Sequence, residues 1–98
     1  MDRESAQIDV AAILITESKA AYIRDSHGVG ANEVLEAFAN QPRYFVDERG
    51  RFAMIGPLRS GHFLLAAIAP AEAEGSLWRL ITAHWLATNQ ARAIYGED

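Results

Sequence analysis

The hydrophobic pattern of the chain changes its period once, next to Pro42. Before that proline, residues 17–26 and 31–40 carry apolar side chains at helical spacing, and Gly28 and Gly30 between them suit the end of one helix and the start of the next. After it come aromatic and aliphatic runs separated by segments rich in turn-forming residues, which is the pattern of consecutive strands. These runs are 43–46, 51–55, 62–69 and 77–86. Helices followed by strands predict an α+β fold, in which an antiparallel sheet carries its helices on one side.

The two ends of the chain predict smaller elements. Residues 8–15 indicate a short strand, and Thr16 after it supplies a hydroxyl that can cap the following helix. Residues 88–95 indicate a short closing helix, whereas residues 1–7 are expected to be loose. We therefore expect one α+β domain over 1–98, with a sheet of about four strands, two N-terminal helices and a short C-terminal helix packed against it.

The composition agrees with one folded domain and excludes several kinds of site. The chain has 98 residues, of which 50% are hydrophobic and 22% are charged, as in ordinary globular proteins. It has no cysteine, which excludes disulfides, thiolate zinc sites and a cysteine nucleophile. Its net charge of −4 and pI near 5.3 differ from the basic character of most nucleic-acid-binding domains. No targeting segment or membrane-spanning stretch is visible, so we expect a cytoplasmic location and no membrane partner.

The last strand, 77–86, is apolar on both faces if its side chains alternate regularly. Regular alternation would place Trp78, Thr82 and His84 on one face and Arg79 on the other. A strand of this kind is typical of the centre of a sheet that is covered on both sides. The alternation therefore predicts that Arg79 points away from the site to which Thr82 and His84 belong.

Five short segments along the chain carry a family resemblance. They are Tyr22–Val29, Glu33–Glu36, Phe38–Pro42, Gly50–Gly56 and Leu80–His84. In their order and spacing, over about residues 13–95, they resemble the BrnT-type ribonuclease toxins of the RelE-like fold. The resemblance implies a small bacterial toxin that cuts RNA without a metal ion and that is neutralised by an antitoxin protein. It implies no cofactor.

The resemblance also implies roles for individual residues. His27 matches the histidine of the family's His-Gly-Val motif, Arg51 matches the arginine that opens its second core strand, and Thr82 matches a small hydroxyl residue in Ile-Ser-Ala-Arg. Arg92 and Tyr95 match a basic residue and a tyrosine of the closing helix.

At other positions the chain departs from the family pattern. His84 stands where the family usually has arginine, and Trp85 stands where a lysine or an acidic residue is common. Ala91 replaces a frequent glutamate, and Ile15 replaces a frequent tryptophan. The basic cluster of the family is therefore thinner in this chain.

Cutting RNA without a metal ion requires a base for the 2′-hydroxyl, an acid for the leaving oxygen and cations beside the phosphate. The imidazole of His84 can take either proton-transfer role, and His27 is a second candidate, for which capping of a helix end is the favoured alternative. Arg51, Arg59 and Arg79 can hold phosphate through paired hydrogen bonds, or they can pair with surface carboxylates. The three histidines stand 35 and 22 residues apart, which is not a ligand spacing, so no metal site is predicted.

Two functions follow from these residues, and the sequence leaves both open. The first is a toxin-like, metal-independent endoribonuclease of a toxin–antitoxin system. Its expected catalytic residues are Arg51, His84, Thr82 and His27. Its expected RNA-binding residues are Arg59, Arg79, Arg92 and Tyr95. The second is a RelE-like domain that has lost catalysis and acts as a protein-binding or regulatory module, for instance as a homodimer, through an apolar patch near Trp85.

Overall fold

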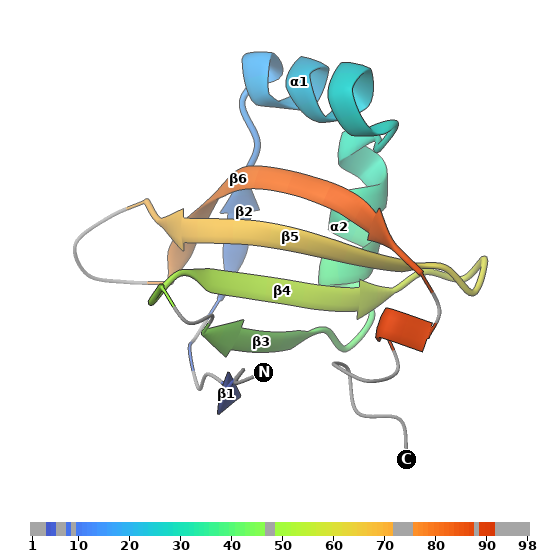
Figure 1. The fold of residues 1–98 in the computed structure, drawn as a ribbon. Helices are drawn as coiled ribbons and strands as arrows, with labels where there is room; N and C mark the ends of the chain where they lie inside the picture. Colours follow the sequence, from blue (N-terminus) through green and yellow to red (C-terminus); the bar gives the residue numbers. More distant parts are fainter. Residues whose placement is uncertain are drawn as a thin grey trace.

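The computed structural model of the chain describes residues 4–5, 8, 10–46, 49–71, 76–87 and 89–91. Within these residues one sheet of six strands, in the order β1-β3-β4-β5-β6-β2, carries two helices (Figure 1). The strands are β1 (Glu4–Ser5), β2 (Ala12–Leu14), β3 (Arg43–Val46), β4 (Phe52–Pro57), β5 (Phe63–Pro70) and β6 (Leu77–Leu86). The helices are α1 (Glu17–His27) and α2 (Ala31–Ala39). The α+β class predicted from the sequence is confirmed.

Both helices begin and end at signals that the sequence carries. Thr16 Oγ1 accepts a hydrogen bond from the backbone N–H of Lys19 at 3.2 Å, which caps the first turn of α1. Gly28 ends α1 in the left-handed conformation, with φ of +67°, and its N–H donates to a carbonyl of the last helical turn at 3.1 Å. The N–H of Gly30, before α2, donates to Glu33 Oε1 at 2.8 Å. The predicted ends of the two helices are thereby confirmed to within a residue.

The described sheet is mixed, and it has more strands than the four that the sequence predicted. Strands β3 to β6 form the antiparallel meander expected from the four apolar runs. The N-terminal part of the chain adds two edge strands, because β2 lies parallel to the first half of β6 and β1 pairs antiparallel with β3. Strand β2 lies within the short strand predicted over 8–15, whereas β1, with two residues, is too short to carry a periodic hydrophobic signal. Glu4 and Ser5, in the segment expected to be loose, are therefore placed in the sheet.

The closing helix predicted over 88–95 lies largely outside the described residues. Residues 89–91 are helical, and the N–H of Ala91 donates to the carbonyl oxygen of Ala87 at 2.9 Å. The side chain of Ala91 is fully buried. In the part of the chain that the structure describes, no helix has the length and apolar character needed to cross a membrane.

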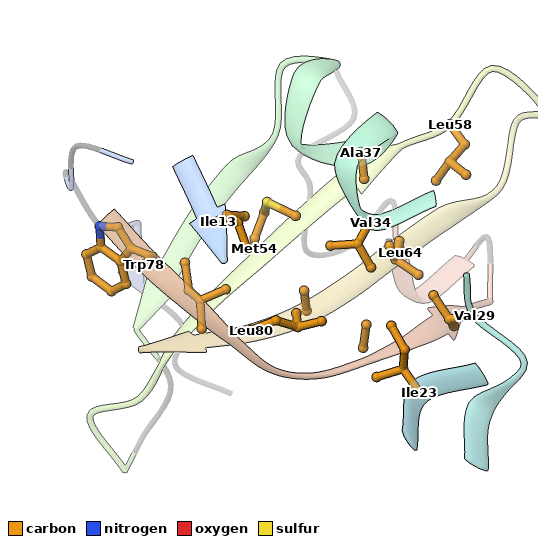
Figure 2. Packing of buried hydrophobic residues seen from close by; sticks show 13 residues of the cluster. Ile13, Ile23, Val29, Val34, Ala37, Met54, Leu58, Leu64, Trp78 and Leu80 are labelled. Atoms are coloured by element: carbon orange, nitrogen blue, oxygen red, sulfur yellow. The ribbon is translucent and has the colours of Figure 1, made fainter. Parts of the chain in front are cut away.

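The helices pack against one face of the sheet and form the main core with it. In Figure 1, α2 passes behind the sheet and α1 lies beyond β6. Figure 2 shows Val34 of α2 directed toward Leu64 of β5, with Ile13 of β2 beside Met54 of β4. The fully buried side chains of this cluster are Ile23, Val29, Val34, Ala37, Met54, Leu64, Ala66 and Ala83. The opposite face of the sheet carries Ala53, Leu65, Ala67, Thr82 and His84, which are not part of this cluster.

A β-bulge interrupts the pairing of β6 with β5. Thr82 pairs with Ala67, but Leu80 pairs with the next residue of β5, Ile68. Ile81 is therefore an extra residue in β6 that has no partner of its own across the pair. Because side chains alternate with a period of two, one extra residue exchanges the faces of all residues beyond it.

The bulge corrects the predicted faces of the last strand. Trp78 faces the helices and is buried there, and beyond the bulge Ala83 does the same. Arg79 shares the opposite face with Thr82 and His84, since their partners on β5 all belong to one alternating set. The prediction that Arg79 points away from Thr82 and His84 is wrong, because it assumed a regular period through the bulge.

The helix layer lies very close to the sheet at Gly56 of β4. A Cβ atom at this position would lie 2.6 Å from the carbonyl oxygen of Ala37 and 2.9 Å from its Cβ. A methyl carbon does not come this close to an oxygen or carbon atom of another residue, so a Cβ at position 56 would force the backbone to shift. The absence of a side chain at Gly56 therefore sets how closely α2 lies on the sheet.

We expect Gly56→Ala to lower the free energy of unfolding by about 1–3 kcal/mol, because α2 or β4 must move to admit the methyl group. Chemical denaturation of the purified variant measures this loss. Gly30→Ala is the matched control, since a Cβ there would come no nearer than 3.4 Å to Glu33 Oε1. Equal stability of Gly56→Ala and the native protein would contradict the close approach of α2.

The phenol of Tyr44 makes stability depend on pH in the alkaline range. Tyr44 packs against the core on the helix side of β3, and burial raises the pKa of its phenol above the ordinary value of about 10. As the pH rises above about 10, the unfolded chain loses this proton while the folded protein retains it, so the free energy of unfolding falls. We expect Tyr44→Phe to lose less stability than the native protein between about pH 9 and pH 11, measured by urea denaturation. Tyr22→Phe, at an exposed position of α1, should behave like the native protein, and equal losses in all three proteins would refute the assignment.

Candidate functional site

Three of the residues singled out in the sequence line one hollow on the opposite face of the sheet. Arg51, Thr82 and His84 meet there, in a hollow of about 230 Å³. The strand register explains the meeting, because Ala53, Ala67 and Thr82 lie side by side across β4, β5 and β6. The two alanines are small and leave room above the sheet. We call this space the polar hollow; its lining is Arg51, Phe52, Ala53, Leu65, Ala67, Thr82 and His84.

His84 is held in a defined tautomer by its neighbour in the chain. Its Nδ1 lies 3.2 Å from the carbonyl oxygen of Trp85. A carbonyl oxygen can only accept a hydrogen bond, so Nδ1 carries the hydrogen in this contact. The neutral ring then keeps a lone pair on Nε2, and that nitrogen can accept a proton from a bound molecule.

The ring of His27 lies next to the ring of His84. The two ring centroids are 5.9 Å apart and the ring planes are tilted by 49°. Tyr22, on the preceding turn of α1, presents its ring edge-on to His27 at 5.7 Å. The end of α1 is attached to β6 at this point, because Trp85 Nε1 donates to the carbonyl oxygen of Gly28 at 3.2 Å. The fold thus brings together two imidazoles that stand 57 residues apart in the sequence.

The hydroxyl of Thr82 has no hydrogen-bond partner among the described residues. Its Oγ1 is inaccessible to solvent in this conformation, although the residue as a whole is half-buried. A hydroxyl can donate one hydrogen bond and accept two, and leaving these unmade in a buried position is unfavourable by about 1–3 kcal/mol. Thr82 therefore offers unused hydrogen-bonding capacity at the wall of the polar hollow.

The residues expected to bind RNA are not gathered at the polar hollow. Arg79 is exposed on the same face but does not line it. Arg59 stands in the turn between β4 and β5, where its backbone N–H donates to Glu36 Oε2 at 2.8 Å. Arg92 and Tyr95 lie outside the described residues.

Arg43 is a candidate that the sequence analysis missed. It pairs with Ile55 of β4, which pairs in turn with Leu65, the partner of His84. Paired residues share a face, so Arg43 stands in the same row as His84 on the opposite face. No sequence signal marks Arg43, because its place in this row follows from the pairing of β3 with β4.

A second hollow adjoins the polar hollow on the same face. Four residues line both hollows, namely Arg51, Phe52, Ala67 and Thr82. The second hollow measures about 440 Å³. The rest of its lining is small or apolar and consists of Gly50, Ile68, Ala69, Pro70 and Ile81. We call it the apolar hollow.

A third hollow lies on the helix side, between α2 and the end of β6. His62 Nδ1 is 3.0 Å from Ser60 Oγ, and the ring of His62 is 5.9 Å from the ring of Trp85. Glu33 completes the lining. Ser60 and His62 stand two residues apart in one exposed turn, where a serine hydroxyl commonly braces the turn. This contact is therefore a local turn contact.

No three His, Asp or Glu side chains within the described ranges lie close enough together to hold a metal ion.

Comparisons with protein-family models, with curated proteins and with solved structures find no match for this chain. The function is therefore argued from the arrangement of the chain's own side chains.

We expect Trp85→Phe to loosen the end of α1, because the carbonyl oxygen of Gly28 loses the indole donor while the aromatic packing is largely kept. The free energy of unfolding should fall by about 1 kcal/mol. The proton NMR contacts between the rings of His27 and His84 should weaken at the same time. Unchanged ring contacts in a destabilised variant would show that Trp85 does not position His27.

Proposed function

We propose that this chain is a toxin-like endoribonuclease that cuts RNA without a metal ion, and that the polar hollow is its active site. The observation that carries the proposal is that Arg51, Thr82 and His84 line one hollow, and that the ring of His27 lies 5.9 Å from the ring of His84. The hydroxyl of Thr82 has no partner among the described residues. RNA contains its own nucleophile, the 2′-hydroxyl beside each phosphate. An enzyme that cuts it needs only to move two protons and to stabilise charge on the phosphate.

In the proposed reaction, His84 Nε2 takes the proton of the 2′-hydroxyl, and the 2′-oxygen forms a bond to the adjacent phosphorus. The bond from phosphorus to the 5′-oxygen breaks, and protonated His27 gives its proton to that oxygen. The products are a 2′,3′-cyclic phosphate and a 5′-hydroxyl, so one proton is taken up and one is released. Arg51 donates hydrogen bonds to the non-bridging phosphate oxygens, and Thr82 Oγ1 donates a further one after its side chain turns toward the hollow.

The assignment of base and acid is supported by the surroundings of the two rings. The contact of His84 Nδ1 with the carbonyl oxygen of Trp85 leaves Nε2 as the free acceptor of the neutral ring. His27 is exposed at the C-terminal end of α1, where a cationic side chain interacts favourably with the helix dipole.

The proposal also covers the basic residues around the polar hollow, the fold family, the location of the protein and its partner. The net charge of −4 means that attraction for RNA must come from a local field, and Arg43, Arg51 and Arg79 are placed on one face to supply it. Arg92 and Tyr95 keep the RNA-binding roles that the family resemblance implies, and Arg59 keeps the phosphate-binding role expected of its guanidinium group. We also propose a RelE-like fold, a cytoplasmic location and an antitoxin protein as partner.

A second candidate function is a protein-binding or regulatory module without catalysis. The observation that favours it is the exposure of three large hydrophobic side chains, with Leu14 at 50%, Tyr22 at 45% and Leu35 at 43%. These side chains belong to three different elements. Trp85, around which an apolar patch was expected, is half-buried, packs against the core and donates a hydrogen bond to Gly28.

We expect the purified protein to cleave end-labelled single-stranded RNA in excess chelator and to leave 2′,3′-cyclic phosphate ends. Arg51→Ala and His84→Ala should each lower the rate by about 10²–10⁴-fold, because each removes a group that acts in the transition state. Gel analysis of the labelled products measures the rates, and replacing the nucleotide at the cut by its 2′-deoxy form should abolish cleavage there.

The matched control is His62→Ala, which removes an exposed imidazole outside the polar hollow and should cleave like the native protein. A loss of activity that is equal in His62→Ala and His84→Ala would place the chemistry elsewhere. If native protein and His84→Ala cleave no faster than a buffer blank, the catalytic proposal fails and the protein-binding module takes its place.

A further inference from the structure

We infer that the apolar hollow binds a nucleobase of the RNA whose phosphate lies in the polar hollow, and that the substrate is therefore unpaired RNA. This inference rests on the proposed function and extends it from the phosphate to the base. It assigns a role to a space that proton transfer does not use.

The two hollows share lining residues that are suited to binding a nucleotide. Arg51 and Thr82 line both, so a phosphate held by Arg51 has the apolar hollow directly beside it. A nucleotide has the same layout, since a short ribose joins a charged phosphate to a flat and largely apolar ring. The second hollow thus lies where the base of a bound nucleotide must go.

The walls of the apolar hollow fit a flat ring. Ala67 and Ala69 contribute only methyl groups on β5, and the bulged Ile81 and Pro70 provide apolar surface at its sides. Apolar contact with such surfaces is not directional, so it depends little on the identity of the base. Thr82 lines both hollows, and its Oγ1 has no partner among the described residues. This hydroxyl is closed to solvent in the present conformation, so it must turn toward the hollows to donate to the phosphate or to accept from an N–H of the base.

Binding of a base in the apolar hollow requires that the base be unpaired. A base in a duplex is stacked and paired, so it cannot enter a hollow in the protein surface without first leaving the helix. Loops and single strands present their bases without this cost. The apolar hollow therefore selects against double-stranded RNA.

The test uses the full chain with alanine methyl groups labelled with carbon-13, observed by NMR. Uridine 3′-monophosphate and adenosine 3′-monophosphate should shift the methyl signals of Ala67 and Ala69 through ring currents, whereas inorganic phosphate alone should not. Ala66 and Ala83 are internal controls, because their methyl groups are fully buried on the helix side of the same strands. An unmoved Ala69 signal, or equal shifts with inorganic phosphate, would overturn the inference.

A variant that fills the hollow provides the second measurement. Ala69→Leu should weaken binding of both nucleotides by at least about fivefold and leave binding of inorganic phosphate unchanged. Ala39→Leu, at an exposed position of α2 on the far side of the sheet, is the matched control and should bind like the native protein. Unchanged signals of Ala66 and Ala83 in Ala69→Leu show that the variant is folded. Equal nucleotide affinity in Ala69→Leu and Ala39→Leu would overturn the inference.

These measurements separate the base site from the chemistry. Methyl shifts without RNA cleavage would keep the base site and remove the proposed catalysis. Cleavage without methyl shifts would keep the catalysis and remove the base site. Cleavage of a single strand that is unaffected when a complementary strand is annealed would contradict the selection against duplex RNA.

Discussion

The extra residue Ile81 in β6 is the constraint on which the two faces of this molecule depend. With Ile81 bulged, Leu80 and Ala83 both face the helices and fill the core, while Thr82 and His84 face the other way. A regular strand that kept Leu80 in the core would bury the hydroxyl and the imidazole beneath α1 and α2 and would expose Ala83. Buried polar groups without partners are costly, so the core and the polar hollow require the same irregularity.

The parts of this structure that depend on neighbouring residues could be predicted from the sequence, and the parts that depend on distant residues could not. Thr16 and Gly28 predicted the ends of α1, and the four apolar runs predicted β3 to β6. The bulge left no signal, because the last strand is apolar on both faces and both phases of its alternation look alike. Strand β1 is too short for a period, and although a strand over 8–15 was expected, the place of β2 in the sheet was not, because the pairing partners of both edge strands lie 40 or more residues away.

In the candidate site, too, the residue types could be predicted from the sequence, whereas their arrangement depends on residues that are distant in the chain. Arg51, Thr82 and His84 were selected from the sequence for their chemistry, but only the register of β4, β5 and β6 places them around one hollow. The approach of His27 to His84 depends on the packing of α1 beside β6, which no local pattern encodes. Arg43 was overlooked because a charged residue at the start of a strand is usually a solvated side chain. Its relevance follows from the pairing of β3 with β4 alone.

His84 and Trp85 are consecutive residues whose side chains leave β6 on opposite sides. One belongs to the polar hollow, and the other is tied to the last turn of α1 through the carbonyl oxygen of Gly28. The position of His27 relative to His84 is therefore set by packing on the side of the sheet that a substrate would not touch. Natural selection on the chemistry of the hollow thus acts on helix-side residues as well, and the helix layer and the face that carries the hollow would evolve under a single constraint.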